Sequence, residues 1–341
     1  MIQPLSLAVG FLPVVLFLIA LLALDSFQLV TRRQVLVSIG WGALAAIVAF
    51  FAHRLLIEGT GMSPLVLRRY VAPALEEVLK AGLVLALVKA HRTGFLVDAG
   101  IHGFAAGTGF ALVENAWYAH TLGDVNPWLW VLRGLGTAVM HGSATAMVGI
   151  VAHAFAERGR RVVIAALPGL AAAWVVHSAY NHLMLNPLLA TAILLVVAPL
   201  ALIATFELSE RATRHWLGHG LDRDAELLEL IHSGAIVSTP VGEYVGSLRE
   251  RFPGPVVADM LCLLEIRLEL AMRAKGLMLA RSAGIDIPSD ASLRANLAEL
   301  KFLEHSIGPT GRLAMMPLLP EGRERWQIRM LEEAGGKSGT S

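Results

Sequence analysis

The chain has 341 residues, of which 55% are hydrophobic and only 16% are charged. Soluble globular domains carry about 25% charged residues, so the composition argues against an ordinary soluble enzyme and indicates a membrane protein. The formal net charge of +1 gives no reason to expect nucleic acid as a partner. The shortage of charge is confined to residues 1–206, whereas residues 207–341 carry acidic and basic side chains at ordinary density.

Long apolar runs in the first part of the chain predict membrane-spanning helices. A helix needs about 20 mostly apolar residues to cross a hydrocarbon core that is ~30 Å thick. By that measure the sequence predicts about seven spans, and the expected fold is an all-α, polytopic transmembrane helix bundle over residues 1–207 in the lipid bilayer. The predicted spans are 5–24, 35–57, 71–90, 95–118, 128–154, 162–183 and 187–207.

Basic residues in alternate loops predict the orientation of the bundle. Cytoplasmic loops are enriched in Lys and Arg, and such residues follow the first, third, fifth and seventh predicted spans. The N-terminus is therefore expected outside and the C-terminal tail in the cytoplasm. Arg54, Arg68 and Arg69 disagree, because they fall around a loop that this orientation places outside.

Residues 208–333 predict a soluble helical domain on the cytoplasmic side. Apolar positions recur there at three- and four-residue spacing, as expected for packed helices. The predicted helices are 222–251, 255–283 and 290–305. Residues 334–341 are predicted to be disordered. The domain shows no catalytic pattern, so its expected role is regulation or homo-oligomerisation.

Charged and polar side chains inside the predicted spans point to function. An ionised group at the centre of a transmembrane helix costs about 2.5–3.5 kcal/mol on insertion scales, so such groups face the bundle interior and often mark a site. The third to sixth predicted spans contain Glu76, Glu77, Lys80, Glu114, His141, His177 and Asn181.

The spacing in the third predicted span suggests how its charges pair. Glu76 and Lys80 are at positions i and i+4 and are predicted to form an ion pair on one helix face. Glu77 lies about 100° further around the helix and is expected to be free of that pair.

The polar residues also share a depth in the membrane. At 1.5 Å per residue they fall in a layer roughly 6–20 Å below one surface. Carboxylates, imidazoles and an amide at one depth suit hydrolysis by water, because a carboxylate can take a proton from water and the other groups can donate to an oxyanion. The same side chains could hold zinc, which would activate the water directly. The residues alone leave both chemistries open.

Other residues of the spans are interpreted as structural. Gly103 and Gly107 form a G-x-x-x-G pair, which allows two membrane helices to approach closely. Asp98 is expected to be an interfacial or a helix-capping residue, and His102 to pack between helices. His53 is interpreted as interfacial and is given no role in the chemistry.

Short motifs follow one another on successive predicted helices. Residues 76–80 (EEVLK) read E-E-x-x-K, residues 110–114 (FALVE) read F-x-x-x-E, and residues 177–181 (HSAYN) read H-x-x-x-N, with His141 on the helix between the last two. In this order they resemble the PrsW family of intramembrane proteases, which is related to type II CAAX prenyl endopeptidases and to bacterial abortive-infection membrane proteins. The resemblance covers about residues 70–185 and leaves the tail unexplained.

The resemblance implies a membrane-embedded endopeptidase of a bacterial plasma membrane, described as glutamate-dependent or metal-dependent. Its substrate would be a single-span membrane protein, such as an anti-sigma factor, that is cut on its outer side. The resemblance does not name the substrate of this chain.

The resemblance also implies a set of site residues. Glu77 would be the leading candidate for activating water, and Asn181, at a position where relatives often carry Asp, would support the oxyanion. The full implied catalytic set is Glu76, Glu77, Glu114, His141, His177 and Asn181. A metal-dependent site would hold zinc through Glu77, Glu114, His141 and His177.

Two other classes of function stay open from the sequence. A proton- or ion-coupled transporter would also place acids and histidines inside a bundle, although the spans show no internal repeat and no broken pair of helices in matching halves. A non-enzymatic membrane scaffold would act through the tail and would tolerate Glu77→Gln and Glu114→Gln. The sequence contains neither H-E-x-x-H nor G-x-S-x-G, which disfavours zincin and serine-hydrolase sites.

Overall fold

The computed structural model describes residues 4–122, 127–182, 186–285, 287, 291–319 and 323–336. These residues form helices and connecting turns, without β-strands, which confirms the predicted all-α fold. The chain divides into two units, Met1–Glu210 and Arg211–Ser341, and the boundary falls within one long helix.

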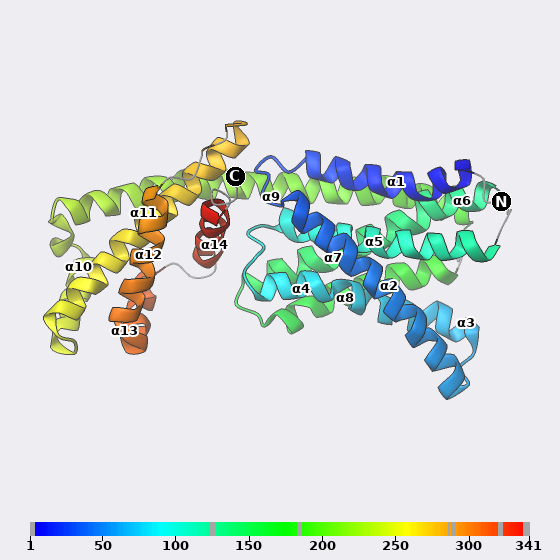
Figure 1. The fold of residues 1–341 in the computed structure, drawn as a ribbon, viewed down its shortest axis with the longest axis horizontal. Helices are drawn as coiled ribbons and strands as arrows, with labels where there is room; N and C mark the ends of the chain where they lie inside the picture. The colour runs from blue at the N-terminus through cyan, green and yellow to red at the C-terminus, as the bar shows by residue number, and fades with distance from the viewer. Residues whose placement is uncertain are drawn as a thin grey trace. The chain divides into compact units, whose positions relative to one another are not determined.

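The first unit is a bundle of long helices (Figure 1). In chain order its elements are α1 (Pro4–Ala23), α2 (Arg32–Thr60), α3 (Pro64–Val66), a π-helical turn (Leu67–Val71), α4 (Ala72–Lys89), α5 (Leu96–Leu122), α6 (Pro127–Val131), a second π-helical turn (Leu132–Thr137), α7 (Ala138–Ala156), α8 (Val162–His182) and the first part of α9 (Pro187–His232).

Several helices of this unit can cross a membrane. Among the described residues, five are long and apolar enough: Arg32–Thr60, Leu96–Thr121, Trp128–Ala156, Val162–His182 and Pro187–His232. The other two predicted spans correspond to α1 and α4. The apolar stretch described for α1 is short, Ala8–Ala23, and α4 carries more charge than a simple span because of its two glutamates and two lysines. The count of about seven spans stays a prediction, whereas the polytopic bundle is established.

Local sequence signals set the helix ends. Thr31 and Gln34 form a reciprocal capping box at the start of α2, and Gly61 ends that helix with a left-handed φ of 64°. Asp98 accepts hydrogen bonds from the backbone N–H groups of Gly94 (2.8 Å) and Phe95 (3.2 Å). Of the two roles predicted for Asp98, interfacial or capping, these hydrogen bonds support capping.

Helix α5 lies between α2 and α7, and small residues allow both contacts. An added Cβ on Gly103 would lie 2.5 Å from the carbonyl oxygen of Thr145, and one on Gly107 would collide with the carbonyl of His141. The G-x-x-x-G pair thus packs α5 closely against α7, as the motif predicts. This contact fixes the position of His141 in the bundle.

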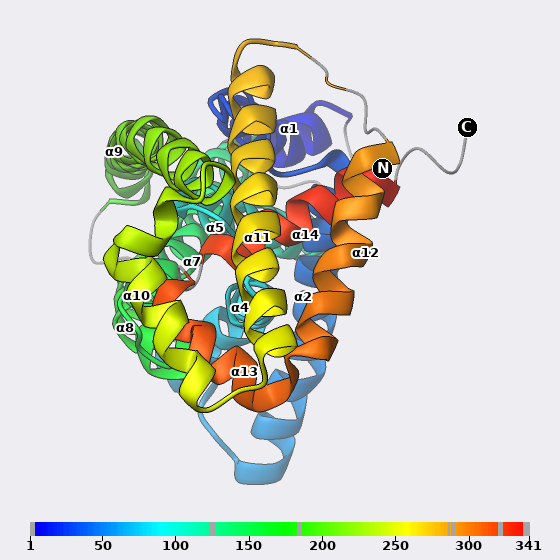
Figure 2. The same cartoon turned by 90° about the vertical axis from the view of Figure 1, so that its left-hand side faces the viewer.

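The second unit is also helical. It contains the end of α9, a 3₁₀ turn (Ala235–Ser238), α10 (Pro240–Ser247), a second 3₁₀ turn (Leu248–Glu250), α11 (Gly254–Ser282), α12 (Ala291–Ser306), α13 (Gly308–Met315), a third 3₁₀ turn (Met316–Leu318) and α14 (Arg323–Gly336). Helix α11 packs against α12 and α14 (Figure 2). Its inward face carries fully buried residues such as Met260 and Leu263.

The helices of the second unit differ in part from those predicted from the sequence. A single helix at 222–251 is wrong, because Gly234 adopts a left-handed φ of 74° and ends the regular path before α10 begins at Pro240. The predicted helices at 255–283 and 290–305 correspond to α11 and α12. The predicted disorder of 334–341 falls partly on the end of α14 and otherwise outside the described residues.

Candidate active site

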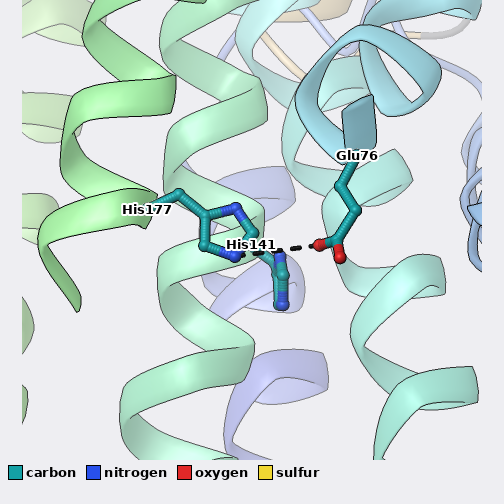
Figure 3. Close-up of side chains that lie close together, drawn as sticks. All are labelled: Glu76, His141 and His177. Atoms are coloured by element: carbon teal, nitrogen blue, oxygen red, sulfur yellow. Dashed lines mark ion pairs between the residues drawn. The ribbon is translucent and has the colours of Figure 1, made fainter. Parts of the chain in front are cut away.

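Helices α4, α5, α7 and α8 bring ionisable side chains together near one end of the first unit. Glu76 and Glu77 lie near the start of α4, and His141 near the start of α7, whereas Glu114 and His177 lie near the ends of α5 and α8. Figure 3 shows Glu76, His141 and His177 pointing toward one another. The structure therefore brings five of the predicted site residues into one connected group.

Glu77 is the most enclosed carboxylate of the group, with a side chain only 1% exposed. Its Oε1 accepts hydrogen bonds from Lys80 Nζ (2.6 Å) and from His177 Nδ1 (2.8 Å). Its Oε2 accepts a longer hydrogen bond from Thr145 Oγ1 (3.4 Å). Both carboxylate oxygens of Glu77 are thus occupied by the protein itself.

The predicted ion pair between Glu76 and Lys80 is wrong. Lys80 pairs with Glu77, three residues away, and reaches across to Nδ1 of His141 at 2.9 Å. Residues at i+3 and i+4 are both neighbours on a helix face, so spacing alone does not choose between them. Lys80 pairs with Glu77 and not with Glu76 because its ammonium also contacts His141 on α7, on the side of α4 where Glu77 lies.

Glu76 has a different environment. Its Oε1 lies 3.6 Å from Nε2 of His53 on α2, and its Oε2 lies 3.7 Å from Nε2 of His177. Both distances exceed a normal hydrogen bond. Among the described residues, Glu76 Oε2 and His53 Nε2 are buried atoms without a hydrogen-bond partner. The interfacial depth of His53 stays a prediction, but its buried Nε2 faces a site carboxylate, which the sequence did not indicate.

The hydrogen bonds indicate which nitrogen of each histidine carries a proton. The carboxylate of Glu77 accepts only, so Nδ1 of His177 donates to it and the lone pair of a neutral ring lies at Nε2. The ammonium of Lys80 donates only, so Nδ1 of His141 accepts and its proton lies at Nε2, 3.2 Å from Glu114 Oε2. The two rings meet edge to face, with centroids 4.8 Å apart.

Glu114 is held by a residue that the sequence reading missed. Nη2 of Arg133 donates to Glu114 Oε2 at 2.9 Å, and Nε of Arg133 donates to Oδ1 of Asn115, also at 2.9 Å. The guanidinium lies 3.6 Å from the ring centroid of Tyr118. The signal was available, because Arg133 is a charged residue inside the predicted span 128–154 and the rule that selected the acids applies to it as well.

Asn181 lies apart from this group. Its Nδ2 donates to the backbone carbonyl of Arg68 at 3.0 Å, in the π-helical turn before α4. The amide thus ties the end of α8 to the segment that leads into the site helix. The oxyanion role implied for Asn181 stays a prediction, and this structure gives it a bracing contact instead.

The donor set fits a metal ion. Glu76, His141 and His177 each offer a ligand atom, these atoms lie within 4.8 Å of one another, and all three residues are buried. Two histidines and one carboxylate are a common ligand set of catalytic zinc sites. To bind an ion, His141 would exchange one of its present partners, Lys80 at Nδ1 or Glu114 at Nε2, for the metal. The unpartnered Oε2 of Glu76 faces the lone-pair nitrogen of His177, as two ligands of one ion would. Compared with the set predicted from the sequence, Glu76 replaces Glu77 and Glu114.

The comparisons with known proteins agree with this geometry. A family model described as PrsW family intramembrane metalloprotease matches residues 31–205, which is more than half of the chain and includes every residue of the site described above. No curated protein and no solved structure matches the chain. With the motifs on successive helices of a membrane bundle and their side chains in one buried group, the chain belongs to the PrsW family of intramembrane metalloproteases.

Proposed function

We propose that this protein hydrolyses a peptide bond of a single-span membrane protein, at a metal centre held by Glu76, His141 and His177. The observation that carries the proposal is the convergence of these three buried side chains, from three helices, with ligand atoms within 4.8 Å of one another. When bound there, a zinc ion would polarise the scissile carbonyl and lower the pKa of a water molecule.

Glu77 and Lys80 orient the two histidines through hydrogen bonds to their Nδ1 atoms. Glu77 accepts a hydrogen bond from Nδ1–H of His177 and so leaves the lone pair at Nε2 of that ring facing Glu76. Carboxylate partners of this kind fix the tautomer and the ring orientation of metal-binding histidines. Lys80 neutralises Glu77 and contacts His141 at the same time. This setting favours a positioning role for Glu77 over the water-activating role that the resemblance implied.

Glu114 is the better candidate for taking a proton from water. Its side chain is 27% exposed, whereas that of Glu77 is 1% exposed, so Glu114 is the more accessible carboxylate of the two. Arg133 and His141 both contact its Oε2, and Oε1 is the atom we assign as proton acceptor. A positioned general base contributes about 10²–10⁴-fold to a rate.

The position of the group supports a membrane-bound substrate. His177 is five residues before the end of α8, which corresponds to about 7–8 Å along a helix axis. A site so close to the ends of its helices is suited to cleaving a peptide bond that lies near one surface of the bilayer. By analogy with the family, the substrate would be a membrane-anchored regulator such as an anti-sigma factor in a bacterial plasma membrane.

The proposal is tested by comparing the N-termini of membrane proteins, by mass spectrometry, in cells that carry the wild type or a site variant. New N-termini near the ends of single-span proteins should appear with the wild type and disappear with Glu76→Gln and with Glu114→Gln. Glu58→Gln is the matched control, because Glu58 lies on α2 with a side chain that is 58% exposed and pairs with Arg54.

The expected loss is at least about 100-fold for Glu114→Gln, since that is the lower range for a general base. Glu58→Gln should leave the fragments unchanged. Fragments that persist in both site variants, with the variants present in the membrane at wild-type levels, would overturn the proposed centre.

A further inference from the structure

His53 lies beside the proposed centre, although it belongs to none of the three motifs that carry the resemblance to the family. It comes from α2, whereas the residues that resemble the family lie on α4, α5 and α8. Its Nε2 is buried and has no hydrogen-bond partner among the described residues. This Nε2 lies 3.6 Å from Oε1 of Glu76.

The two oxygens of Glu76 therefore face different histidines. Oε2 lies 3.7 Å from Nε2 of His177, and Oε1 lies 3.6 Å from Nε2 of His53. Two atoms bound to one zinc ion at about 2.0–2.1 Å are about 3.4 Å apart at a tetrahedral angle, so the first distance is close to that of a ligand pair. His53 is outside the group of three residues whose ligand atoms all lie within 4.8 Å of one another.

We propose that His53 is a positioning residue, whose Nε2–H holds Oε1 of Glu76 so that Oε2 is presented to His177 and the metal. The inference rests on the proposed function. Carboxylates that ligate a metal are themselves hydrogen-bonded in most sites, and loss of such a partner costs 10–100-fold in metal affinity or activity. Hydrogen bonds at a reaction centre are often long before the centre is loaded, which agrees with the distance of 3.6 Å.

Helix α2 has a second polar contact to α4, and this contact supplies a control. Nε1 of Trp41 donates to the backbone carbonyl of Leu79 at 3.0 Å. An added Cβ on Gly82 would lie 2.8 Å from the Trp41 ring, so the ring packs directly on α4. Trp41→Phe removes the hydrogen bond between the same two helices without touching Glu76.

The test measures Zn²⁺ binding to the purified, metal-stripped full chain in lipid nanodiscs, by competition with a chromogenic chelator. We expect His53→Leu to weaken Zn²⁺ affinity 10–100-fold. His53→Gln should keep an affinity near that of the wild type, because its amide N–H can donate from a similar position. Trp41→Phe should also bind like the wild type.

The outcomes separate this inference from the proposed function. Glu76→Gln and His177→Ala should abolish stoichiometric binding; a wild type that binds no Zn²⁺ would overturn the metal centre and this inference together. If the wild type binds and His53→Leu binds equally well, the inference alone is overturned. It is also overturned if Trp41→Phe weakens binding as much as His53→Leu, because the effect would then be one of helix packing.

Discussion

Lys80 is the residue that connects the two histidine-bearing helices to α4. Its side chain is fully buried, and its ammonium lies 2.6 Å from Glu77 and 2.9 Å from His141. Glu77 in turn binds His177, so a single cation organises both imidazoles of the site. A buried charge of this kind is stable only with its partner, and removing one member leaves the other uncompensated.

We expect Lys80→Met to destabilise the protein by about 3–5 kcal/mol, because the carboxylate of Glu77 would stay buried without a cation. The double variant Lys80→Met/Glu77→Gln should recover much of this loss, since no unpaired charge remains. Reversible unfolding in mixed micelles would measure both free energies.

The exposed pair of Arg54 and Glu58 on α2 provides the control, because the side chains are 67% and 58% exposed. Arg54→Met should leave the unfolding free energy unchanged, as exposed ion pairs contribute little. A Lys80→Met variant as stable as the wild type would show that the pair is not buried as described.

At the scale of residues, the sequence predicted which side chains matter better than it predicted their partners. Intramembrane charge identified Glu76, Glu77 and Glu114, because burying an acid in a span is costly whatever its neighbours. The partner of Lys80 depended on the packing of α7, which no local spacing encodes. His53 lies toward the end of an apolar run, where an interfacial place is equally compatible with the pattern, and only the contact of α2 with α4 brings it to Glu76.

At the scale of elements, the contact of α5 with α7 fixes the depth and rotation of His141. Gly107 lies directly against the backbone of His141, and Gly103 against that of Thr145. Phe104, between these glycines, is fully buried and packs its ring against Gly142. Any side chain at Gly107 must push α7 away from α5.

Gly107→Val is therefore expected to abolish cleavage and to lower the unfolding free energy by about 1–3 kcal/mol, the usual range for overpacking. Displacement of α7 would move His141 away from Lys80 and Glu114. The readouts are the substrate fragments, counted as for the site variants, and thermal unfolding of the purified protein.

Gly40→Val is the matched control, because an added Cβ at Gly40 of α2 has no atom within 4 Å. Gly40→Val should keep both cleavage and stability. Equal activity of the Gly107→Val and Gly40→Val variants would contradict the close approach of α5 and α7.

The spans were predictable because the length and the hydropathy of each apolar run can be read from the sequence. The predicted 71–90, 95–118 and 162–183 correspond closely to α4, α5 and α8. The length of α9 was not predictable in this way, since Pro187–His232 continues far beyond the apolar run. A change from apolar to charged residues marks the end of a hydrophobic environment, but it does not end a helix.

At the scale of the whole molecule, the orientation in the membrane is still a prediction from the basic loops, and the tail offers a direct reporter of it. Cys262 is the only cysteine of the chain, and it is exposed on α11. Partial burial, together with the nearby carboxylates of Glu265, Asp259 and Glu299, raises the pKa of its thiol. Its thiolate fraction, and hence its reactivity, is lower at neutral pH than that of a free cysteine and rises with pH.

A membrane-impermeant maleimide should label Cys262 in inside-out vesicles and leave it unlabelled in intact cells, if the tail is cytoplasmic. Labelling should be faster at about pH 8.5 than at pH 7, because the thiolate is the reactive form. Cys262→Ser shows the background, and detergent-permeabilised cells show full access. Labelling of intact cells would reverse the predicted orientation.

Helix α1 lies outside the region that the family model matches, which begins at residue 31. Asn115, adjacent to Glu114 and only 1% exposed, nevertheless donates from Nδ2 to the carbonyl oxygen of Gly10 on α1 at 2.7 Å. A chain shortened to residue 31 would keep every matched position, yet it would leave this buried amide without its acceptor, at a cost of about 1–3 kcal/mol. The folded core of this chain thus extends beyond the matched region, because a buried side chain next to Glu114 depends on a backbone acceptor in α1.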